Sequence, residues 1–432
     1  MTRTSIRSVR ARQILDSRGR PTVEVDVELD SGASGRASVP SGASTGTWEA
    51  RELRDGDPAR FQGLGVLGAV AHVNGEIAVA LKGADAIAQA TIDERLCALD
   101  GTPQLGRLGA NAVLGVSIAV CRAAAAACGQ PLYRRIAELC GIGEVRMPLP
   151  MTNILSGGLH AGRSMDIQDF LAIPARAASI EEAIHVMASV RSAATDVSRA
   201  RGLPTLLADE GGLSPGLESS VAALEMMVES IEAAGLEPGR DVVIAVDVAA
   251  TALHRGAGRY ELVREGRMLD AAGMVALMGE WITRFPVVSI EDALDEEDWD
   301  GWKHASRALA AKVQLVGDDL FVTHEERLRR GIREGVGNAV LVKVNQNGTL
   351  SGTLRVIALA RSHGYAPIVS ARSGETEDPF IADLAVGSAA GQIKIGSLRT
   401  SSTVAKYNQL LRIEEECRAP YAGLAALAPD PA

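Results

Sequence analysis

Six short apolar runs between residues 241 and 397 each end in a polar or charged residue, and this pattern constrains the fold most strongly. Continuous apolar runs are typical of parallel strands buried on both faces, and the later intervals of about 22 to 29 residues suit strand–helix units. The longer interval from Asp247 to Glu291 must hold extra structure. The pattern predicts an α/β fold built as a β/α barrel. The runs are DVVIAVD, FPVVSIED, KVQLVGDD, NAVLVKVNQ, APIVSARS and GQIKIGS.

The first 135 or so residues have a different pattern. The run TVEVDVEL at 22–29 alternates apolar with acidic residues, as expected for a strand with one buried face, and DSG then supplies a turn. The segment PSGASTGTWEA has the composition of a mobile flap, and helices are expected near 65–92, 109–128 and 131–140. We therefore expect a separate α+β domain over residues 1–136 and the barrel over residues 137–432.

The overall composition excludes several classes of protein. A net charge of −10 and a pI near 5.4 argue against nucleic-acid or membrane-surface binding, which needs a basic field. The five cysteines are odd in number and form no C-x-x-C pair, which fits a reducing cytosol. AVLGVSIAVCRAAAAACG is interrupted by Arg122 and rich in alanine, so it is interpreted as a packed helix. We expect a cytoplasmic protein with neither a nucleic-acid nor a membrane partner.

The polar residues at the ends of the runs predict an active-site ring. The C-terminal ends of barrel strands share one face, and the side chains there perform the chemistry. For a single acid, capping of the following helix is the simpler explanation. For the whole set that explanation is poor, because its members have complementary chemistry. They are Asp247, Glu291, Asp318, Lys343, Arg372, Ser373 and Lys394.

Asp247, Glu291 and Asp318 are three carboxylates with no His or Cys among them, which favours a hard cation, Mg²⁺ before Mn²⁺. Arg372 with Ser373 offers a guanidinium fork and a hydroxyl that match phosphate or carboxylate. An alternative of equal weight is a buried arginine paired with one of the many nearby acids, such as Glu375 or Glu377.

Lysine inside an apolar strand is costly unless it is paired or used, and this applies to Lys343 and Lys394. Beside metal ions and a second ammonium, a lysine can be held partly neutral and act as a base. The turn LADEGGLSP places Asp209 and Glu210 where a carboxyl group could enter the barrel mouth. Together these groups indicate proton abstraction next to a carboxylate, followed by loss of a leaving group.

These residues lie in segments that resemble the enolase family along essentially the whole chain. The segments are ILDSRGRPTVEVDVEL, PSGASTG, DEGG, SIEDALDEEDWDGW, VGDDLFVT, RSGETED and VAKYNQLLRIEE. The resemblance implies an α+β domain capping a modified eight-stranded, TIM-like barrel, and a homodimer or larger homo-oligomer. It also implies a glycolytic hydro-lyase that interconverts 2-phosphoglycerate and phosphoenolpyruvate with two Mg²⁺ ions per site. A secondary cell-surface or secreted pool is a further expectation for this family.

The resemblance also implies a role for each matching residue. Lys343 would remove the C2 proton and Glu210 would assist loss of the C3 hydroxyl. Asp247, Glu291 and Asp318 would bind the first Mg²⁺, and Ser44 in the flap would close over the second. The substrate would be bound by His160, Gln168, Asp169, Arg372, Ser373 and Lys394.

Three positions depart from the family pattern near the substrate. Asp169 stands where the family usually has Glu, Ala371 where it has His, and Ser156 where it has Asn, while Arg163 adds a charge nearby. We favour an ordinary enolase. The alternatives are a low-activity paralogue or a carboxyphosphonoenolpyruvate synthase of phosphonate-antibiotic biosynthesis, whose pocket would need space near Ala371. A non-catalytic surface-binding role is the least supported.

Overall fold

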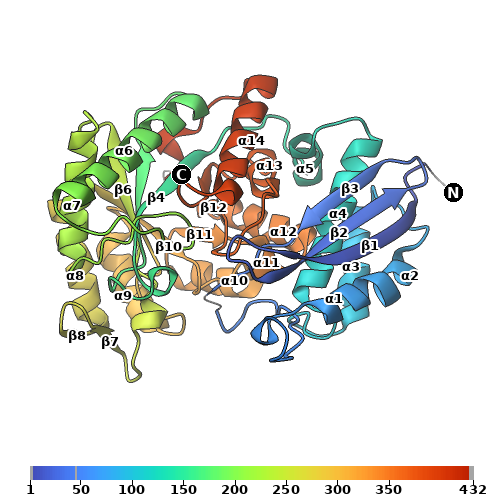
Figure 1. Cartoon of the computed structure of the whole chain (residues 1–432), viewed down its shortest axis with the longest axis horizontal. Helices are drawn as coiled ribbons and strands as arrows, with labels where there is room; N and C mark the ends of the chain where they lie inside the picture. Colours follow the sequence, from blue (N-terminus) through green and yellow to red (C-terminus); the bar gives the residue numbers. More distant parts are fainter. Residues whose placement is uncertain (1–2, 44–45, 428–432) are drawn as a thin grey trace.

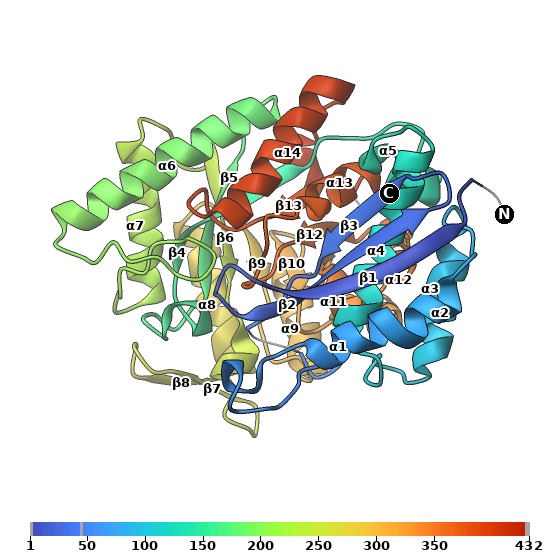
Figure 2. The same ribbon diagram turned by 45° about the vertical axis from the view of Figure 1, so that its right-hand side comes forward.

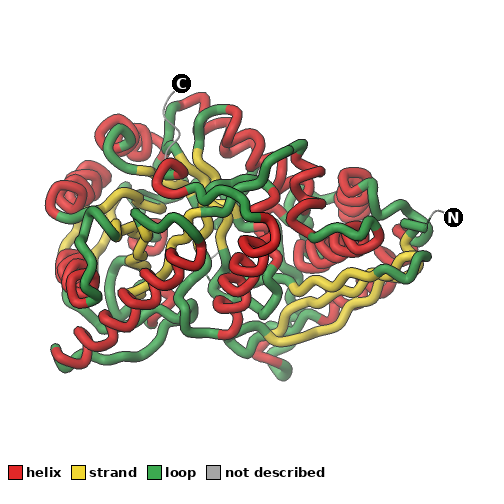
Figure 3. Tube along the Cα trace, turned by 90° about the horizontal axis from the view of Figure 1, so that it is seen from above, coloured by secondary structure: helices red, strands yellow, loops and turns green. Residues whose placement is uncertain are grey.

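The computed structural model describes residues 3–43 and 46–427, so the predicted metal ligand Ser44 lies outside the described residues. Figure 1 shows two parts side by side, a small unit of strands and helices coloured blue to teal and a barrel surrounded by helices. The same division is visible after a 45° turn in Figure 2. Figure 3 shows the strands of the small unit at one end of the molecule, apart from the barrel strands.

The N-terminal unit is a three-stranded antiparallel sheet packed on helices. Its strands are β1 (Ile6–Leu15), β2 (Pro21–Leu29) and β3 (Ser34–Ser38). The apolar residues of β2, from Val23 to Leu29 at every second position, are fully buried, as the alternating pattern predicts. The helices are α1 (Leu67–His72), the π-helical turn η2 (Val73–Ile77), α2 (Ala78–Leu81), α3 (Gln89–Asp100), α4 (Ala110–Ala127) and α5 (Leu132–Cys140).

Two of the helices predicted for this unit, those over 65–92 and 109–128, have features that the sequence alone did not give. The helix expected over 65–92 ends at Leu81 and resumes at Gln89, because Gly83 adopts a left-handed conformation with φ +77° between the two pieces. Helix α4 is long and apolar enough to cross a membrane, yet 83 % of its apolar window is buried inside the protein. It packs on β2 and β3 so closely that a Cβ at Gly35 would lie 2.2 Å from the carbonyl oxygen of Ala119.

The division of the chain at residue 136 stays a prediction, and α5 runs across that position.

Eight strands form a closed barrel in the order β10-β11-β12-β13-β4-β5-β6-β9. Each of the six predicted runs contains one barrel strand. The barrel strands are β4 (Leu149–Ser156), β5 (Asp169–Pro174), β6 (Val242–Asp247), β9 (Val287–Glu291), β10 (Gln314–Gly317), β11 (Ala339–Val342), β12 (Ala366–Ser370) and β13 (Gln392–Lys394). The helices between and after them are α6 (Ile180–Ala200), α7 (Ser220–Ala233), α8 (Ala271–Arg284), α9 (Trp299–Leu309), α10 (Glu325–Glu334), α11 (Val344–Asn347), α12 (Leu350–Ser362), α13 (Phe380–Gly387) and α14 (Ser401–Cys417).

The barrel departs from uniform strand–helix alternation at β5, which is antiparallel to both β4 and β6. The connection from Ser156 to Asp169 holds only a short 3₁₀ turn, η3 (Leu159–Ala161), and parallel neighbours need a longer crossover. The long interval before Glu291 does hold extra structure. It contains the 3₁₀ turn η4 (Ala250–Leu253), the hairpin strands β7 (Arg259–Leu262) and β8 (Arg267–Asp270), and α8.

The barrel interior is filled by its own apolar layer, and the C-terminal segment closes the end where the strands begin. The segment that holds the 3₁₀ turn η5 (Gly423–Ala426) contacts β4, and the side-chain amide of Gln392 donates to the carbonyl of Ala426 at 2.6 Å. Tyr421, Ala426 and Leu427 pack against the interior cluster, so the opposite mouth is the one left for a site. The interior layer consists of Leu149, Met151, Leu171, Ile173, Val243, Ala245, Val316, Ala339, Leu341, Ala366 and Ile368.

The N-terminal unit is fastened to the barrel at the segment that follows β12. Ser41 and Gly374 exchange two backbone hydrogen bonds of 2.8 and 2.9 Å, and the amide of Ser17 donates to the carbonyl of Glu375 at 2.7 Å. Arg122 of α4 forms an ion pair with Asp378. These contacts place the unit directly over the C-terminal end of β12.

We expect the Asp383→Asn variant to gain stability relative to the wild-type protein as pH rises from about 4 to about 6. Burial between α13 and α14 raises the pKa of Asp383 to about 6 from an ordinary 3.8, despite the charge of Arg122. The folded protein then binds a proton that the unfolded chain has lost, so this group lowers stability as pH rises, by roughly 3 kcal/mol at most. Urea unfolding at several pH values measures the difference. The exposed Asp300→Asn variant is the control, and an equal pH profile for both variants would contradict the expectation.

Candidate active site

The ends of the neighbouring strands β5, β6 and β9 align carboxylates at the open mouth of the barrel. Asp169 is paired with Asp247 across β5 and β6, and Asp247 is paired with Glu291 across β6 and β9. Asp318 follows β10 directly, and all of these side chains are buried. Buried carboxylates at such short distances repel one another unless cations lie between them.

Lys394, the last residue of β13, supplies one such cation. Its Nζ lies 2.8 Å from Asp247 Oδ2 and 2.7 Å from Glu291 Oε2. Burial tends to raise the pKa of Asp247, but the charge of Lys394 outweighs it and holds that pKa below its usual value. Burial and the charge of Asp247 raise the pKa of Glu291 well above its usual value. One ammonium therefore does not neutralise both carboxylates.

Lys343, which follows β11, forms a close ion pair with Asp318. Asp318 also accepts a hydrogen bond of 2.9 Å from the side-chain amide of Gln346 in the short helix α11. Burial by itself lowers the pKa of Lys343, but the charge of Asp318 raises it above its ordinary value. The positive charges of Arg372 and Lys394 oppose this increase, and a partly neutral lysine beside a metal ion stays a prediction.

Arg372 is buried and pairs with an acid from the N-terminal unit. Its Nη1 lies 3.1 Å from Glu49 Oε2 and donates to Asn345 Oδ1 at 2.9 Å. The alternative of a buried arginine paired with an acid is therefore met, but by Glu49 and not by Glu375 or Glu377. Glu375 instead accepts the backbone amide of Arg372 at 3.0 Å and pairs with Lys406 at 2.8 Å, and Glu377 accepts the hydroxyl of Ser401 at 3.0 Å.

Ser373 is also contacted by the N-terminal unit. Its hydroxyl oxygen accepts hydrogen bonds from the Arg18 guanidinium at 3.1 Å and from the backbone amide of Ala43 at 2.7 Å. Arg18 is in turn held by Asp16, whose carboxylate lies 2.9 Å away. The Arg18 guanidinium therefore contacts the hydroxyl of Ser373 directly, and Arg372 precedes Ser373 in the chain, so the segment after β12 offers groups that can bind an anion.

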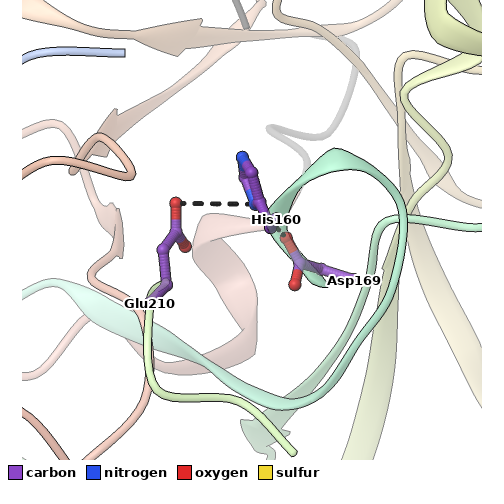
Figure 4. A group of neighbouring side chains, drawn as sticks. All are labelled: His160, Asp169 and Glu210. Atoms are coloured by element: carbon purple, nitrogen blue, oxygen red, sulfur yellow. Dashed lines mark ion pairs between the residues drawn. The ribbon is translucent and has the colours of Figure 1, made fainter. Parts of the chain in front are cut away.

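Figure 4 shows the third group of the mouth, in which His160 points between Asp169 and Glu210. His160 Nδ1 lies 3.5 Å from Asp169 Oδ2 and 3.9 Å from Glu210 Oε1. Burial alone lowers the pKa of the His160 imidazole, but Asp169 and Glu210 together raise it to about 9. Burial raises the pKa of Glu210, although the charge of His160 opposes this, and Glu210 Oε2 accepts the amide of Asn153 at 3.1 Å.

The positions that depart from the family pattern lie within these groups. Ser156 and Asp169 are cross-strand partners on β4 and β5, and the hydroxyl of Ser156 donates to Asp169 Oδ1. Ala371 is buried directly after β12, where its backbone amide donates to the carbonyl of Lys394 at 2.9 Å. Its methyl group can neither donate nor accept a proton. Arg163, with φ +58°, lies exposed on the loop that carries His160.

The mouth has the donor set of a divalent metal site. Carboxylate oxygens of Asp292, Asp318 and Asp319 lie within 4.8 Å of one another, as do ligand atoms of His160, Asp169 and Glu210. Among the described residues, the buried Glu291 Oε1 has no hydrogen-bond partner. A dication beside this oxygen would supply the charge that the single Lys394 ammonium does not. The residues at the ends of β6, β9 and β10 therefore fit a hard cation.

The structure brings every described candidate residue to this mouth, including Gln168, whose amide donates to Asp247 at 3.1 Å. Sequence reasoning missed Glu49, Arg18, Asn153 and Asn345, which hold the candidate residues in place. Glu49 and Arg18 come from another part of the chain, and nothing in the sequence assigns them to the barrel mouth. The available signal was that Arg18, Asn345 and Glu49 lie within motifs, ILDSRGRP, VKVNQ and PSGASTGTWEA, already singled out for other reasons.

The fold and the mouth define a barrel enzyme with an α+β cap and a carboxylate-rich barrel mouth. Family models described as "Enolase, N-terminal domain" and "Enolase, C-terminal TIM barrel domain" match residues 6–136 and 144–429. The chain belongs to the enolase family, and the enzyme is a lyase of the enolase superfamily.

We expect the Lys406→Met variant to lose about 3–5 kcal/mol of stability, because it leaves the Glu375 carboxylate buried without its cation. Lys406 on α14 is fully buried, and its Nζ also donates to the carbonyl of Thr376 at 2.6 Å. Adding Glu375→Gln removes the unpaired charge and restores a large part of the loss. Urea unfolding of the single and double variants measures both values. A double variant no more stable than the single one would show that the ion pair is not the cause.

Proposed function

We propose that the protein is a Mg²⁺-dependent enolase that interconverts 2-phosphoglycerate and phosphoenolpyruvate. The observation that carries the proposal is that a buried carboxylic acid and two lysines lie at the same barrel mouth. Glu210 is buried with a raised pKa, as a proton donor needs, and the charges of Lys394 at the end of β13 and Lys343 directly after β11 act on it. A buried acid and a lysine at the same barrel mouth suit removal of one proton and delivery of another.

Asp247, Glu291 and Asp318 would hold the first Mg²⁺, since Mg²⁺ prefers carboxylate oxygens. When bound, the ion stabilises the negative charge that develops on the substrate carboxylate. The residues present fit this role because Glu291 Oε1 is buried and without a partner among the described residues. Two ions per site, as the family implies, stay part of the proposal.

Lys343 is the proposed base for the C2 proton. A base must be neutral before it accepts a proton, and the ion pair with Asp318 works against this. Any second positive charge that engages Asp318 weakens its hold on Lys343 and lowers the pKa of the lysine. Lys394 has the complementary role: it stays charged between two acids and orients the substrate carboxylate.

Glu210 is the proposed acid for the departing C3 hydroxyl. Asn153 fixes one of its oxygens, so the other is free to face the substrate, and His160 lies beside it. Arg372 and Ser373, with Arg18, bind the phosphate. Arg372 is paired with Glu49, so a bound phosphate must share the guanidinium with that carboxylate.

The second candidate is carboxyphosphonoenolpyruvate synthesis, and the observation that favours it is Ala371. Its buried methyl lies beside Arg372 where the family has an imidazole, and Asp169 is tied to Ser156 on the same face. The deprotonation side keeps all its groups, whereas the side that handles hydroxyl departure has fewer polar ones. A small phosphorylated acid as substrate, a homo-oligomeric state and a cytoplasmic location are parts of the proposal that both candidates share.

We expect the purified protein to form phosphoenolpyruvate from 2-phosphoglycerate with Mg²⁺, and to stop when EDTA removes the ion. Lys343→Ala should lower both product formation and exchange of the C2 proton by at least about 100-fold, because a positioned base contributes that much. Absorbance of the product and NMR of the exchange measure the two rates. Lys303→Ala, on the outer helix α9, is the matched control. Exchange without product would contradict the enolase assignment and favour the second candidate.

We expect the combined variant Ser156→Asn, Asp169→Glu, Ala371→His to raise the rate of product formation by about tenfold or more while C2 exchange stays the same, because each lost polar group of this kind costs about that much or more. The three changes restore polar groups only on the side of hydroxyl departure. Ala371→Leu is the control for size without polarity. An equal effect on exchange and elimination would show that the three positions do not act on that step.

A further inference from the structure

Arg191 of α6 is a buried cation that has no acidic partner in the part of the chain that the structure describes. Arg191 is only 4 % exposed. Its Nε donates to Ser397 Oγ at 3.2 Å, its Nη1 donates to Thr195 Oγ1 at 2.6 Å, and its Nη2 donates to the carbonyl of Gly211 at 3.3 Å. All three acceptors are neutral, and no carboxylate among residues 3–43 and 46–427 lies within ion-pair distance. Burial, followed by the positive charge of Arg399, lowers the pKa of Arg191 to about 10. A buried charge without a counter-charge is costly, so a ligand for it is expected.

Arg191 lines a cavity of about 330 Å³ between α6, at the upper left in Figure 1, and the segment that follows β13. Arg399 lines the same cavity, is exposed, and makes no hydrogen bond or ion pair with any residue that the structure describes. The one acid in the lining, Asp196, pairs with Arg199 at 3.1 Å, so the lining keeps an excess of positive charge. The full lining is Ala188, Arg191, Ser192, Thr195, Asp196, Arg199, Leu398 and Arg399.

We propose that this cavity binds a small phosphate-bearing anion between Arg191 and Arg399. A guanidinium carries five N–H groups, and the three hydrogen bonds of Arg191 leave two of them without an acceptor. Phosphate accepts from several directions at once, which suits two guanidinium groups and the hydroxyl of Ser192. The site is separate from Arg372 and Ser373, which belong to the barrel mouth. Because the protein as a whole is acidic, such a local excess of positive charge is not explained by its general field.

The same arginine connects the cavity to the catalytic turn. Its Nη2 holds the carbonyl of Gly211, the neighbour of Glu210, and its Nε holds the hydroxyl of Ser397, whose amide donates to the carbonyl of Glu210 at 2.8 Å. An anion that draws on the guanidinium must alter these two hydrogen bonds. The bound anion therefore acts on the turn that positions Glu210, from the outer face of the barrel.

The test is calorimetric titration of the full-length protein with inorganic phosphate, compared with Arg399→Gln and Ser192→Glu. Both side chains are exposed, so these variants keep the fold. The first removes one guanidinium and the second places a carboxylate in the cavity. We expect each to weaken one class of phosphate binding at least tenfold and to leave binding at the barrel mouth unchanged. Arg176→Gln, whose side chain is 59 % exposed on another surface, is the matched control. Repeating the titration with 2-phosphoglycerate in place of phosphate distinguishes an organic phosphate from the free ion.

Hydrogen–deuterium exchange gives a second readout that does not need activity. Phosphate should change exchange in residues 208–213 in the wild-type protein by more than it does in Arg399→Gln, since that difference isolates the cavity from the barrel mouth. Phosphate binding that is identical in the wild type and in both variants would overturn the proposal. So would an altered oligomeric state in Arg399→Gln without any change in phosphate binding, because an acidic side chain of a second copy would then be the occupant.

Discussion

The balance of charge at the barrel mouth is the constraint on which the rest of the structure depends. Carboxylates from three adjacent strands are buried together, and Lys394 and Lys343 are the cations that hold Asp247, Glu291 and Asp318 at this distance. Burying ions is costly unless a partner in favourable geometry offsets the loss of water. The strands must therefore keep their register, because a shift of one residue would turn these side chains to the other face of the sheet.

The N-terminal unit belongs to the same balance. Glu49 provides the counter-charge for Arg372, and Arg18 completes the contacts of Ser373, so neither barrel residue is satisfied by the barrel alone. The backbone pairing of Ser41 with Gly374 fixes the distance between the two parts. Separating the two domains would remove Glu49 from Arg372 and Arg18 from Ser373. The N-terminal unit is therefore a part of the site.

The strand ends could be predicted because continuous apolar runs and their spacing are local properties of the chain. Asp247, Glu291 and Lys394 could be placed at one mouth in this way. The antiparallel β5 could not, since its direction follows from a connection too short for a crossover, and not from its own residues. The pairing of Arg372 with Glu49 was equally out of reach, because nearby acids compete on equal terms in the sequence and only the folded chain shows which is closest.

The C-terminal segment that closes the far end of the barrel has a practical consequence. Residue 427 lies where the strands begin, with Gln392 and Gln314 at the first positions of β13 and β10 holding the carbonyls of Ala426 and Leu427. The barrel mouth lies at the other end of the same strands. A surface linker joined directly after residue 427 would therefore lie on the side away from the barrel mouth, so protein immobilised in this way would present its mouth to the solution.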